Sequence, residues 1–252
     1  MARYDFRSPR LFVDAAFAPG AVVALAPNQT NYLRNVLRLK PGAPVLVFNG
    51  RDGEWRAELR AVGKKGAELS TVERVREQTG PEDLHYLFSP LKHARLDYMV
   101  QKAVEMGASR LQPVIMRHTQ AERVNLDRMR ANAIEAAEQC GILAIAEIAA
   151  PKPFDSLTRG WKADRLLVFC DEEADVKDPV AALATARSGG IAGRPPVSVL
   201  IGPEGGFAEN ERAALLKLPN VVRLGLGPRI LRADTAAVAA LTLVQSVLGD
   251  WR

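Results

Sequence analysis

The 252-residue chain is 48% hydrophobic, which is enough for the core of one large domain or two small ones. Its net charge of +5 and pI near 9.4 are compatible with a polyanionic partner, but charge alone does not identify one. Cys140 and Cys170 form no C-x-x-C pair, which argues against a disulfide framework or zinc site and fits a reducing cytoplasm. Neither a signal peptide nor an apolar run of about 18 residues is visible, so we expect no membrane span.

Residues 1–78 are expected to form a small β-rich domain. Short apolar or alternating runs separated by Gly, Pro and Asn turns predict strands over 11–13, 21–25, 45–49, 54–62 and 68–75. One helix is predicted among them, from Gln29 to Arg38, capped by Asn28 and ended before Pro41. Thr79-Gly80-Pro81 then has the composition of a linker.

Residues 79–252 are expected to form an α/β domain. Strands are predicted over 84–91, 111–116, 166–170, 197–201 and 221–224, and helices over 97–106, 126–139, 179–186, 208–218 and 233–248. Such alternation is typical of a mostly parallel sheet covered on both faces.

Two glycine-rich loops near the end of the chain indicate a ligand site. Gly202-Pro203-Glu204-Gly205-Gly206 joins a strand to a helix, and Gly225-Leu226-Gly227-Pro228 follows the next strand. Ligands bind at the carboxyl ends of parallel strands, and glycine lets a flat ligand lie against bare backbone. A tight turn that binds nothing would explain one such loop equally well, but two successive units favour a site. No P-loop or strand-linked G-x-G-x-x-G is present, which disfavours a nucleoside triphosphate or dinucleotide.

These two loops carry a family resemblance. The sequence GPEGG, followed by L-G-x-x-I-L-R-x-x-T-A at 226–236, resembles the SPOUT superfamily of S-adenosylmethionine (SAM)-dependent RNA methyltransferases. With NYLRNVLR at 31–38, KHARLDYMVQKAVEMG at 92–107 and EAAEQCG at 135–141, the nearest similarity is to the RsmE family of 16S rRNA uridine-N3 methyltransferases. The resemblance implies a PUA-like RNA-binding first domain and a deep trefoil knot at about 195–245. It also implies a cytoplasmic enzyme with SAM as methyl donor and 16S rRNA, or the small ribosomal subunit, as partner.

The resemblance also implies the residues that contact the cofactor, mainly through backbone atoms. They are Leu200, Ile201, Gly202, Glu204 and Gly205 from the first loop, and Leu224, Gly225, Ile230 and Leu231 from the second. Phe169 and Cys170, at the end of a third strand, would form either the remaining wall or part of the core.

Three residues near the loops are candidates for catalysis, because methylation at N3 removes an imide proton. Arg232 would stabilise negative charge on the uracil oxygens, the alternative being a structural ion pair to Asp234. Glu204 would act either as a base or as an acceptor that orients the loop. Asp234 is better explained as a helix cap, and it stands where the family usually has Glu.

RNA contacts are expected to be spread over both domains. The candidates are Arg7, Arg10, Arg34 and Arg38 in the first domain, with Arg34 and Arg38 on one helix face, and Lys92 and Arg95 at the start of the second. An ordinary solvated surface is the alternative for each taken singly. His85, His93 and His118 show no ligand spacing, so we expect no metal.

One segment departs from the family pattern, and one helix predicts a partner. After Gly141 the family continues with arginines and proline, whereas this chain has the apolar run Ile142 to Ala146, which would change substrate grip, dimer packing or activity. The helix 233–248 is apolar over more than one face, in keeping with the homodimers usual in the superfamily, the alternative being full burial in a monomer. The alternatives to an rRNA uridine methyltransferase are a SPOUT enzyme for another rRNA or tRNA base, and an RNA-binding assembly factor without catalysis.

Overall fold

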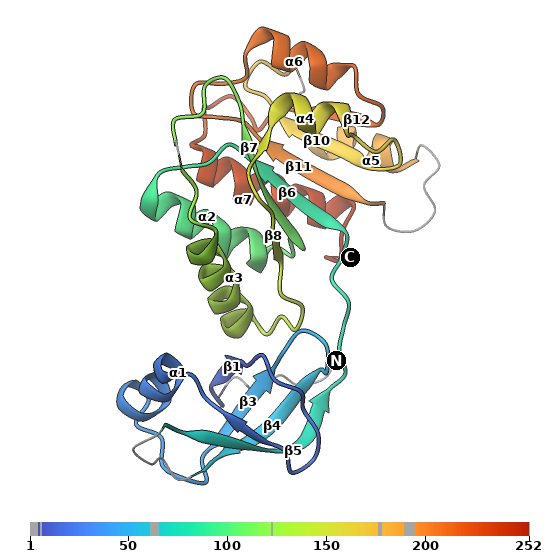
Figure 1. The fold of residues 1–252 in the computed structure, drawn as a ribbon. Helices are drawn as coiled ribbons and strands as arrows, with labels where there is room; N and C mark the ends of the chain where they lie inside the picture. Colours follow the sequence, from blue (N-terminus) through green and yellow to red (C-terminus); the bar gives the residue numbers. More distant parts are fainter. Residues whose placement is uncertain are drawn as a thin grey trace. The chain divides into compact units, whose positions relative to one another are not determined.

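The protein is described here by a computed structural model, which covers residues 5, 7–60, 66–121, 123–175, 178–188 and 195–251. The chain forms two compact units, one made of Met1–Gly80 with Ala137–Ile145 and the other of Pro81–Ala136 with Ala146–Arg252. The first is the β-rich unit and the second the α/β unit (Figure 1). Residues 137–145, which the sequence assigned to the second domain, therefore belong to the first unit.

The first unit contains a five-stranded sheet in the order β1-β3-β4-β5-β2. Its strands are β1 (Arg10–Phe12), β2 (Val22–Ala24), β3 (Pro44–Phe48), β4 (Glu54–Leu59) and β5 (Glu68–Arg76). Only β1 and β3 pair in parallel, and the other pairs are antiparallel. Leu33, Val45, Val47, Leu59 and Leu69 are at most 2% exposed and form the centre of its core.

The helix of the first unit differs from its prediction at both ends. It begins as α1 (Pro27–Asn31) and continues as a π-helical turn, η1 (Tyr32–Val36). Ala26, rather than Asn28, is the N-cap residue, and the Gln29 side chain accepts its N–H at 3.1 Å. Arg38 lies beyond the helix end with a φ of 54°, so it does not share a helix face with Arg34.

The apolar segment after Gly141 belongs to the core of the first unit. Leu143 is 1% exposed and packs with Phe48 and Ala137, and Ile142 and Ile145 lie half-buried around them. Burial of these side chains against the β-rich unit, rather than a contact with RNA, accounts for the apolar run.

The second unit contains a seven-stranded sheet in which β12-β10-β11-β6-β7-β8 follow one another and β9 also pairs with β7. The strands are β6 (Leu84–Phe88), β7 (Arg110–Ile115), β8 (Glu147–Ile148), β9 (Lys152–Pro153), β10 (Leu166–Cys170), β11 (Val197–Ile201) and β12 (Val221–Leu224). All the pairings are parallel. This confirms the predicted α/β class.

Helices lie on both faces of this sheet (Figure 1). They are α2 (His93–Glu105), α3 (Leu126–Cys140), α4 (Phe154–Arg159), α5 (Pro179–Ser188), α6 (Glu209–Leu216) and α7 (Ala233–Val247). Leu87, Phe169 and Leu200 point from one face into a cluster with α4 and α6. Helix α7 contacts β11, α2 and α5. The two shortest strands, β8 and β9, and the six-residue α4 were not predicted.

Candidate functional site

The site lies where three parallel strands end. In the sheet, β10 separates β11 from β12, so the two glycine-rich loops flank the end of β10 instead of following neighbouring strands. The loops after all three strands enclose a cavity of about 740 Å³, here named the larger cavity. Most of the residues predicted to contact a cofactor line it: Ile201, Gly202, Glu204, Gly205, Leu224, Gly225, Ile230 and Leu231.

Leu200 and Phe169 lie beneath this cavity in the core. Both are fully buried, and Phe169 packs edge-on against Phe207 with ring centroids 5.8 Å apart. Cys170, one residue further along β10, lines the larger cavity. Burial, with a smaller contribution from Asp171, raises the pKa of its thiol to about 12, so it is held as the neutral thiol.

Two of the three glycines of the first loop, Gly202 and Gly206, are constrained by the protein's own packing. Gly206 has a φ of +73°, and a Cβ there would meet the carboxylate of Glu172. A Cβ on Gly202 would come within 2.9 Å of the Phe207 ring. These side chains account for two glycines that the sequence had left open between a ligand site and a tight turn.

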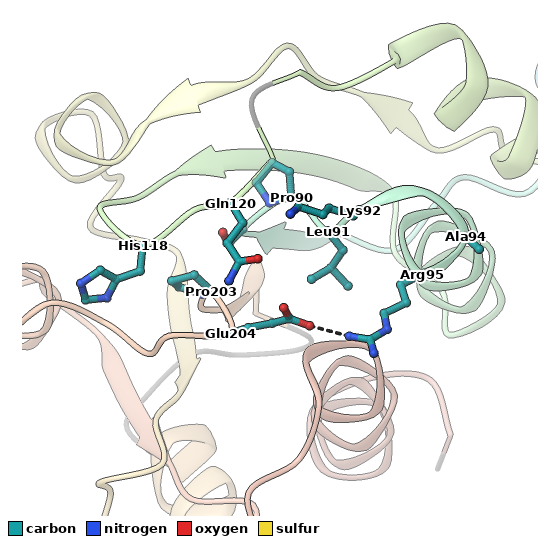
Figure 2. Close-up of a pocket in the computed structure, with 10 residues that line it drawn as sticks. Pro90, Leu91, Lys92, Ala94, Arg95, His118, Gln120, Pro203 and Glu204 are labelled. Atoms are coloured by element: carbon teal, nitrogen blue, oxygen red, sulfur yellow. Dashed lines mark hydrogen bonds and ion pairs between the residues drawn. The ribbon is translucent and has the colours of Figure 1, made fainter.

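Glu204 forms an ion pair with Arg95, whose Nη1 lies 2.5 Å from Oε1 (Figure 2). The pair joins α2 to the loop after β11. Arg95, Pro203 and Glu204 line both the larger cavity and a neighbouring one of about 350 Å³, here named the smaller cavity. Within the described residues, the partner of Glu204 is thus a guanidinium rather than the loop backbone.

Arg232 is exposed, lines the larger cavity and precedes the first residue of α7. No ion pair joins it to Asp234 in the described structure. Asp234 does not line the larger cavity. Its Oδ1 accepts the N–H of Thr235 at 3.0 Å, so its carboxylate satisfies a donor in the first turn of α7 from within the helix, not from the N-cap position.

Asp171 is a residue that the sequence analysis missed. It follows β10, lines the larger cavity and is 2% exposed. Its carboxylate accepts hydrogen bonds from Nε of Arg212 at 2.9 Å and Nε of Arg223 at 2.8 Å. Burial would raise the pKa of Asp171, but the bonds from Arg212 and from the Glu173 N–H, with the charge of Arg223, outweigh it and hold the pKa below 3.8. The sequence signal that could have identified Asp171 is an acidic residue directly after a buried strand.

Arg10 has a structural position instead of the RNA-facing one we expected. Its side chain is 10% exposed, and its guanidinium lies 2.7 Å from Glu54. It also donates to the carbonyl oxygens of Ala137 and Glu138 in the same unit.

The other predicted RNA contacts lie at or near the surface. Arg7, Arg34 and Arg38 are exposed in the first unit. In the second unit Lys92 is exposed, and Arg95 pairs with Glu204.

Within the described ranges, no group of His, Cys, Asp and Glu side chains is arranged to hold a metal ion. His85 lies 3.1 Å from Asp83, and His118 lies 3.1 Å from the carbonyl oxygen of Gly206. The side chain of His93 lies outside the described structure. None of the described helices has the length and apolar character needed to cross a membrane.

Comparison with known proteins agrees with this geometry. The model of the RNA methyltransferase domain matches residues 78–245, and that of the RNA methyltransferase PUA domain matches residues 25–72. The "Ribosomal RNA small subunit methyltransferase E" of Rickettsia conorii is 27% identical over 94% of each chain. Its Synechocystis counterpart is 29% identical over 90% of this chain and 74% of its own length.

Two solved structures share the fold along nearly the whole chain. Lpg2936 of Legionella pneumophila, described as a methyltransferase and solved with bound SAM, has a TM-score of 0.80 at 28% identity and covers 95% of this chain and 98% of its own. A Neisseria gonorrhoeae protein has the same TM-score at 24% identity and covers 98% and 100%, respectively. Since the first family model covers more than half of the sequence, the chain belongs to the RNA methyltransferase domain family, with a PUA domain in its first unit.

Proposed function

We propose that this protein transfers a methyl group from SAM to N3 of a specific uridine in the 16S rRNA of the small ribosomal subunit. The observation that carries the proposal is the larger cavity at the ends of β10, β11 and β12, built by the two loops whose sequences resemble the RsmE family. Relatives named ribosomal RNA small subunit methyltransferase E support the substrate. The SAM-bound Legionella structure, at 28% identity, supports the methyl donor.

The larger cavity fits SAM in size and chemistry. Its volume of about 740 Å³ lies within the range of about 300 to 1,000 Å³ typical of small-molecule sites. Ile201, Leu224 and Leu231 provide apolar walls for an adenine ring, and Glu172 provides a carboxylate for a cationic ligand. We assign the cofactor contacts to the eight predicted residues that line the cavity, leaving out the buried Leu200. SAM supplies an electrophilic methyl group.

Arg232 is the residue we assign to stabilising the uracil anion. Its guanidinium is permanently charged, and at this edge of the sheet it is available to carbonyl oxygens of the base. Glu204 is the carboxylate we assign to the N3 proton, since it lines the cavity. Asp234 supports the site through the first turn of α7.

RNA binding is assigned to exposed basic residues of both units. Arg7, Arg34 and Arg38 in the first unit and Lys92 in the second have the charge and exposure needed to contact phosphates. The PUA domain supports an RNA-binding role for the first unit.

The knot, the homodimer and the cytoplasmic location belong to the same proposal. The crossing of the chain from β11 past β10 to β12 supports a trefoil knot at about 195–245. Val238, Leu243 and Val247 of α7 stay half-buried, and Ile230 is 91% exposed, which leaves apolar surface for a second copy. A solution mass near the 27.4 kDa of one chain would contradict the dimer.

The decisive experiment transfers labelled methyl from SAM to unmodified small subunits, to free rRNA and to tRNA, with the product nucleoside identified by mass spectrometry. We expect 3-methyluridine in small-subunit rRNA. Label in tRNA or on another base would replace the proposed substrate. RNA binding with neither cofactor binding nor methyl transfer would support an RNA-binding assembly factor, and cofactor binding without transfer would point to the altered segment after Gly141 or to a missing partner.

A further inference from the structure

The smaller cavity is the strongest unassigned feature of the α/β unit. It lies beside the larger cavity, and Arg95, Pro203 and Glu204 line both. Its volume of about 350 Å³ is at the lower end of the range for small-molecule sites. A site of this size, sharing a wall with a methyl-donor site, suits one nucleotide better than a second cofactor.

The lining of the smaller cavity has the chemistry to bind a pyrimidine nucleotide. Pro90, Leu91 and Pro203 provide apolar surface for a planar ring. Gln120 offers an amide with two donors and one acceptor, and Lys92 offers a cation for a phosphate. Both side chains are exposed, and neither has a hydrogen-bond or ion-pair partner among the described residues. In Figure 2 the Gln120 amide is directed toward Glu204 and Leu91, whereas the His118 ring points away from them.

Hydrogen bonds hold the wall that carries Gln120 in place. Oγ1 of Thr119 accepts the N–H of Met116 at 2.9 Å and lies 2.9 Å from Oγ of Ser89, another lining residue. The adjacent His118 lies 3.1 Å from the carbonyl oxygen of Gly206. The backbone that carries Gln120 is therefore fixed to the loops after β6 and β11, which limits the positions that its exposed side chain can reach.

The ion pair between Arg95 and Glu204 lies at the wall that the two cavities share. A base that occupies the smaller cavity with its N3 edge toward the larger one presents N3–H, O2 and O4 to this pair. Glu204 can then take the N3 proton. Arg95 can donate hydrogen bonds to one of the two oxygens that flank N3, and Arg232, which lines the larger cavity, to the other.

We propose that the smaller cavity binds the target uridine of the RNA, with Gln120 recognising the uracil ring, Lys92 its phosphate, and Arg95 acting with Glu204 on the imide. This inference rests on the proposed function. In the step, the N3–H bond breaks and its proton passes to the Glu204 carboxylate. The N3 electron pair forms the new N–CH₃ bond, and the electrons of the S–CH₃ bond remain on sulfur.

Kinetics with unmodified small-subunit rRNA separate the roles. We expect Gln120→Ala and Lys92→Ala each to raise the KM for RNA about tenfold, with kcat changed less, because they remove binding contacts. Arg95→Gln should lower kcat about 100-fold, as loss of one anion-stabilising donor does. The matched controls are Gln139→Ala, exposed near the end of α3, and Lys217→Ala, exposed at the end of α6. Calorimetry should give SAM affinities within about twofold of wild type for the Gln120 and Lys92 variants.

Crosslinking gives a readout that does not depend on turnover. Full-length protein saturated with S-adenosylhomocysteine is irradiated with rRNA transcribed with 4-thiouridine, and the crosslinked peptides are sequenced. We expect crosslinks within residues 89–95 and 118–120, lost when the target uridine has been methylated beforehand. Crosslinks only outside these stretches, together with an unchanged KM in Gln120→Ala and Lys92→Ala, would overturn the inference. If the wild type still methylates the RNA in that case, the proposed function stands. Absence of SAM binding and of methylation by the wild type would instead remove the proposed function.

Discussion

The two edges of the parallel sheet use charged residues differently. At the amino ends of the strands, Asp83 pairs with Arg165 at 2.5 Å and with His85 at 3.1 Å. On the neighbouring strands, Arg110 pairs with Glu147 at 2.6 Å. Each of these side chains finds its partner inside the unit.

At the carboxyl ends, several cations remain without such partners. Lys92, Arg229 and Arg232 are exposed beside the two cavities, and none of them forms an ion pair among the residues that the structure describes. The difference teaches that the ligand-binding edge combines paired acids, Asp171 and Glu204, with exposed cations that have no ion-pair partner in the described chain. The following predictions test that distinction.

The largest expected effect is on stability, from Asp171, the buried acid of the larger cavity. Asp171→Ala would leave Arg212, 7% exposed, with only the exposed carboxylates of Glu209 at 2.9 Å and Glu173 at 3.2 Å. Because these carboxylates still compensate the charge in part, we expect a loss of about 3 kcal/mol of unfolding free energy, at the lower end of the range for a broken buried pair. Urea unfolding measures it, with the exposed Asp164→Ala as control. An equal, small change in both variants would show that the pair contributes little.

The same pair predicts an acid dependence. Because the pKa of Asp171 is lower in the folded protein than the ordinary 3.8, the ionised form stabilises the fold above about that pH. The stabilisation is lost as the pH falls through the folded pKa. The wild type should therefore lose unfolding free energy below about pH 4 more steeply than Asp171→Asn.

Arg232→Ala should affect methylation and leave stability almost unchanged, because the side chain is exposed and lacks an ion-pair partner within the described chain. Loss of a charge-stabilising donor lowers turnover about 100-fold. Labelled methyl transfer measures the effect, and calorimetry should show nearly unchanged SAM affinity. Arg159→Ala, at the exposed last residue of α4, is the control. Unchanged turnover in Arg232→Ala would remove the residue from the mechanism.

A pair of glycine substitutions separates backbone strain from cavity packing. Gly20 and Gly206 have similar positive φ values, +77° and +73°, but only at Gly206 would a Cβ meet another side chain, Glu172. Gly20→Ala should cost about 1 kcal/mol, and Gly206→Ala more, together with weaker SAM binding. Thermal unfolding measures the loss of stability in each variant, and calorimetry measures its affinity for SAM. Equal losses in the two variants would show that contact with Glu172 is unimportant.

The smallest expected effect lies at the amino edge. Burial, with repulsion from Arg165, lowers the pKa of His85 from 6.5 to about 4. The unfolded chain therefore binds this proton more tightly, and stability should fall as the pH decreases from about 6.5 to 4. Because solvent screens the partly exposed His85 side chain, the change in unfolding free energy is limited to on the order of 1 kcal/mol. His85→Asn should flatten the urea-unfolding profile in that window, and a parallel profile would contradict this origin.

Local patterns predicted the strands around the site well and their order poorly. The apolar runs 166–170, 197–201 and 221–224 match β10, β11 and β12 at both ends. Their order, with β10 in the middle, depends on pairings such as Leu167 with Val221, which no local periodicity encodes. The role of Asp171 was missed because the arginines that bind it, Arg212 and Arg223, lie 41 and 52 residues further along the chain.

Side-chain roles were predictable only where the partner was near in sequence. Arg10 looked like a surface arginine because Glu54, its partner 44 residues away, becomes adjacent only when β1 and β4 join one sheet. Ile142 to Ile145 looked anomalous because Phe48, which Leu143 contacts, lies far earlier in the chain. The glycine-rich loops, by contrast, carry their pattern within a few residues, and the resemblance made from them identified the family.

The position of β10 between β11 and β12 also bears on how the protein folds. Strand β12 follows β11 in the sequence but does not pair with it. Its partner is β10, which was synthesised about fifty residues earlier. Distant pairings of this kind slow folding, because loop closure costs entropy before any contact repays it. The α/β unit should accordingly acquire its cofactor site as a late event, after the sheet from β6 to β11 has formed.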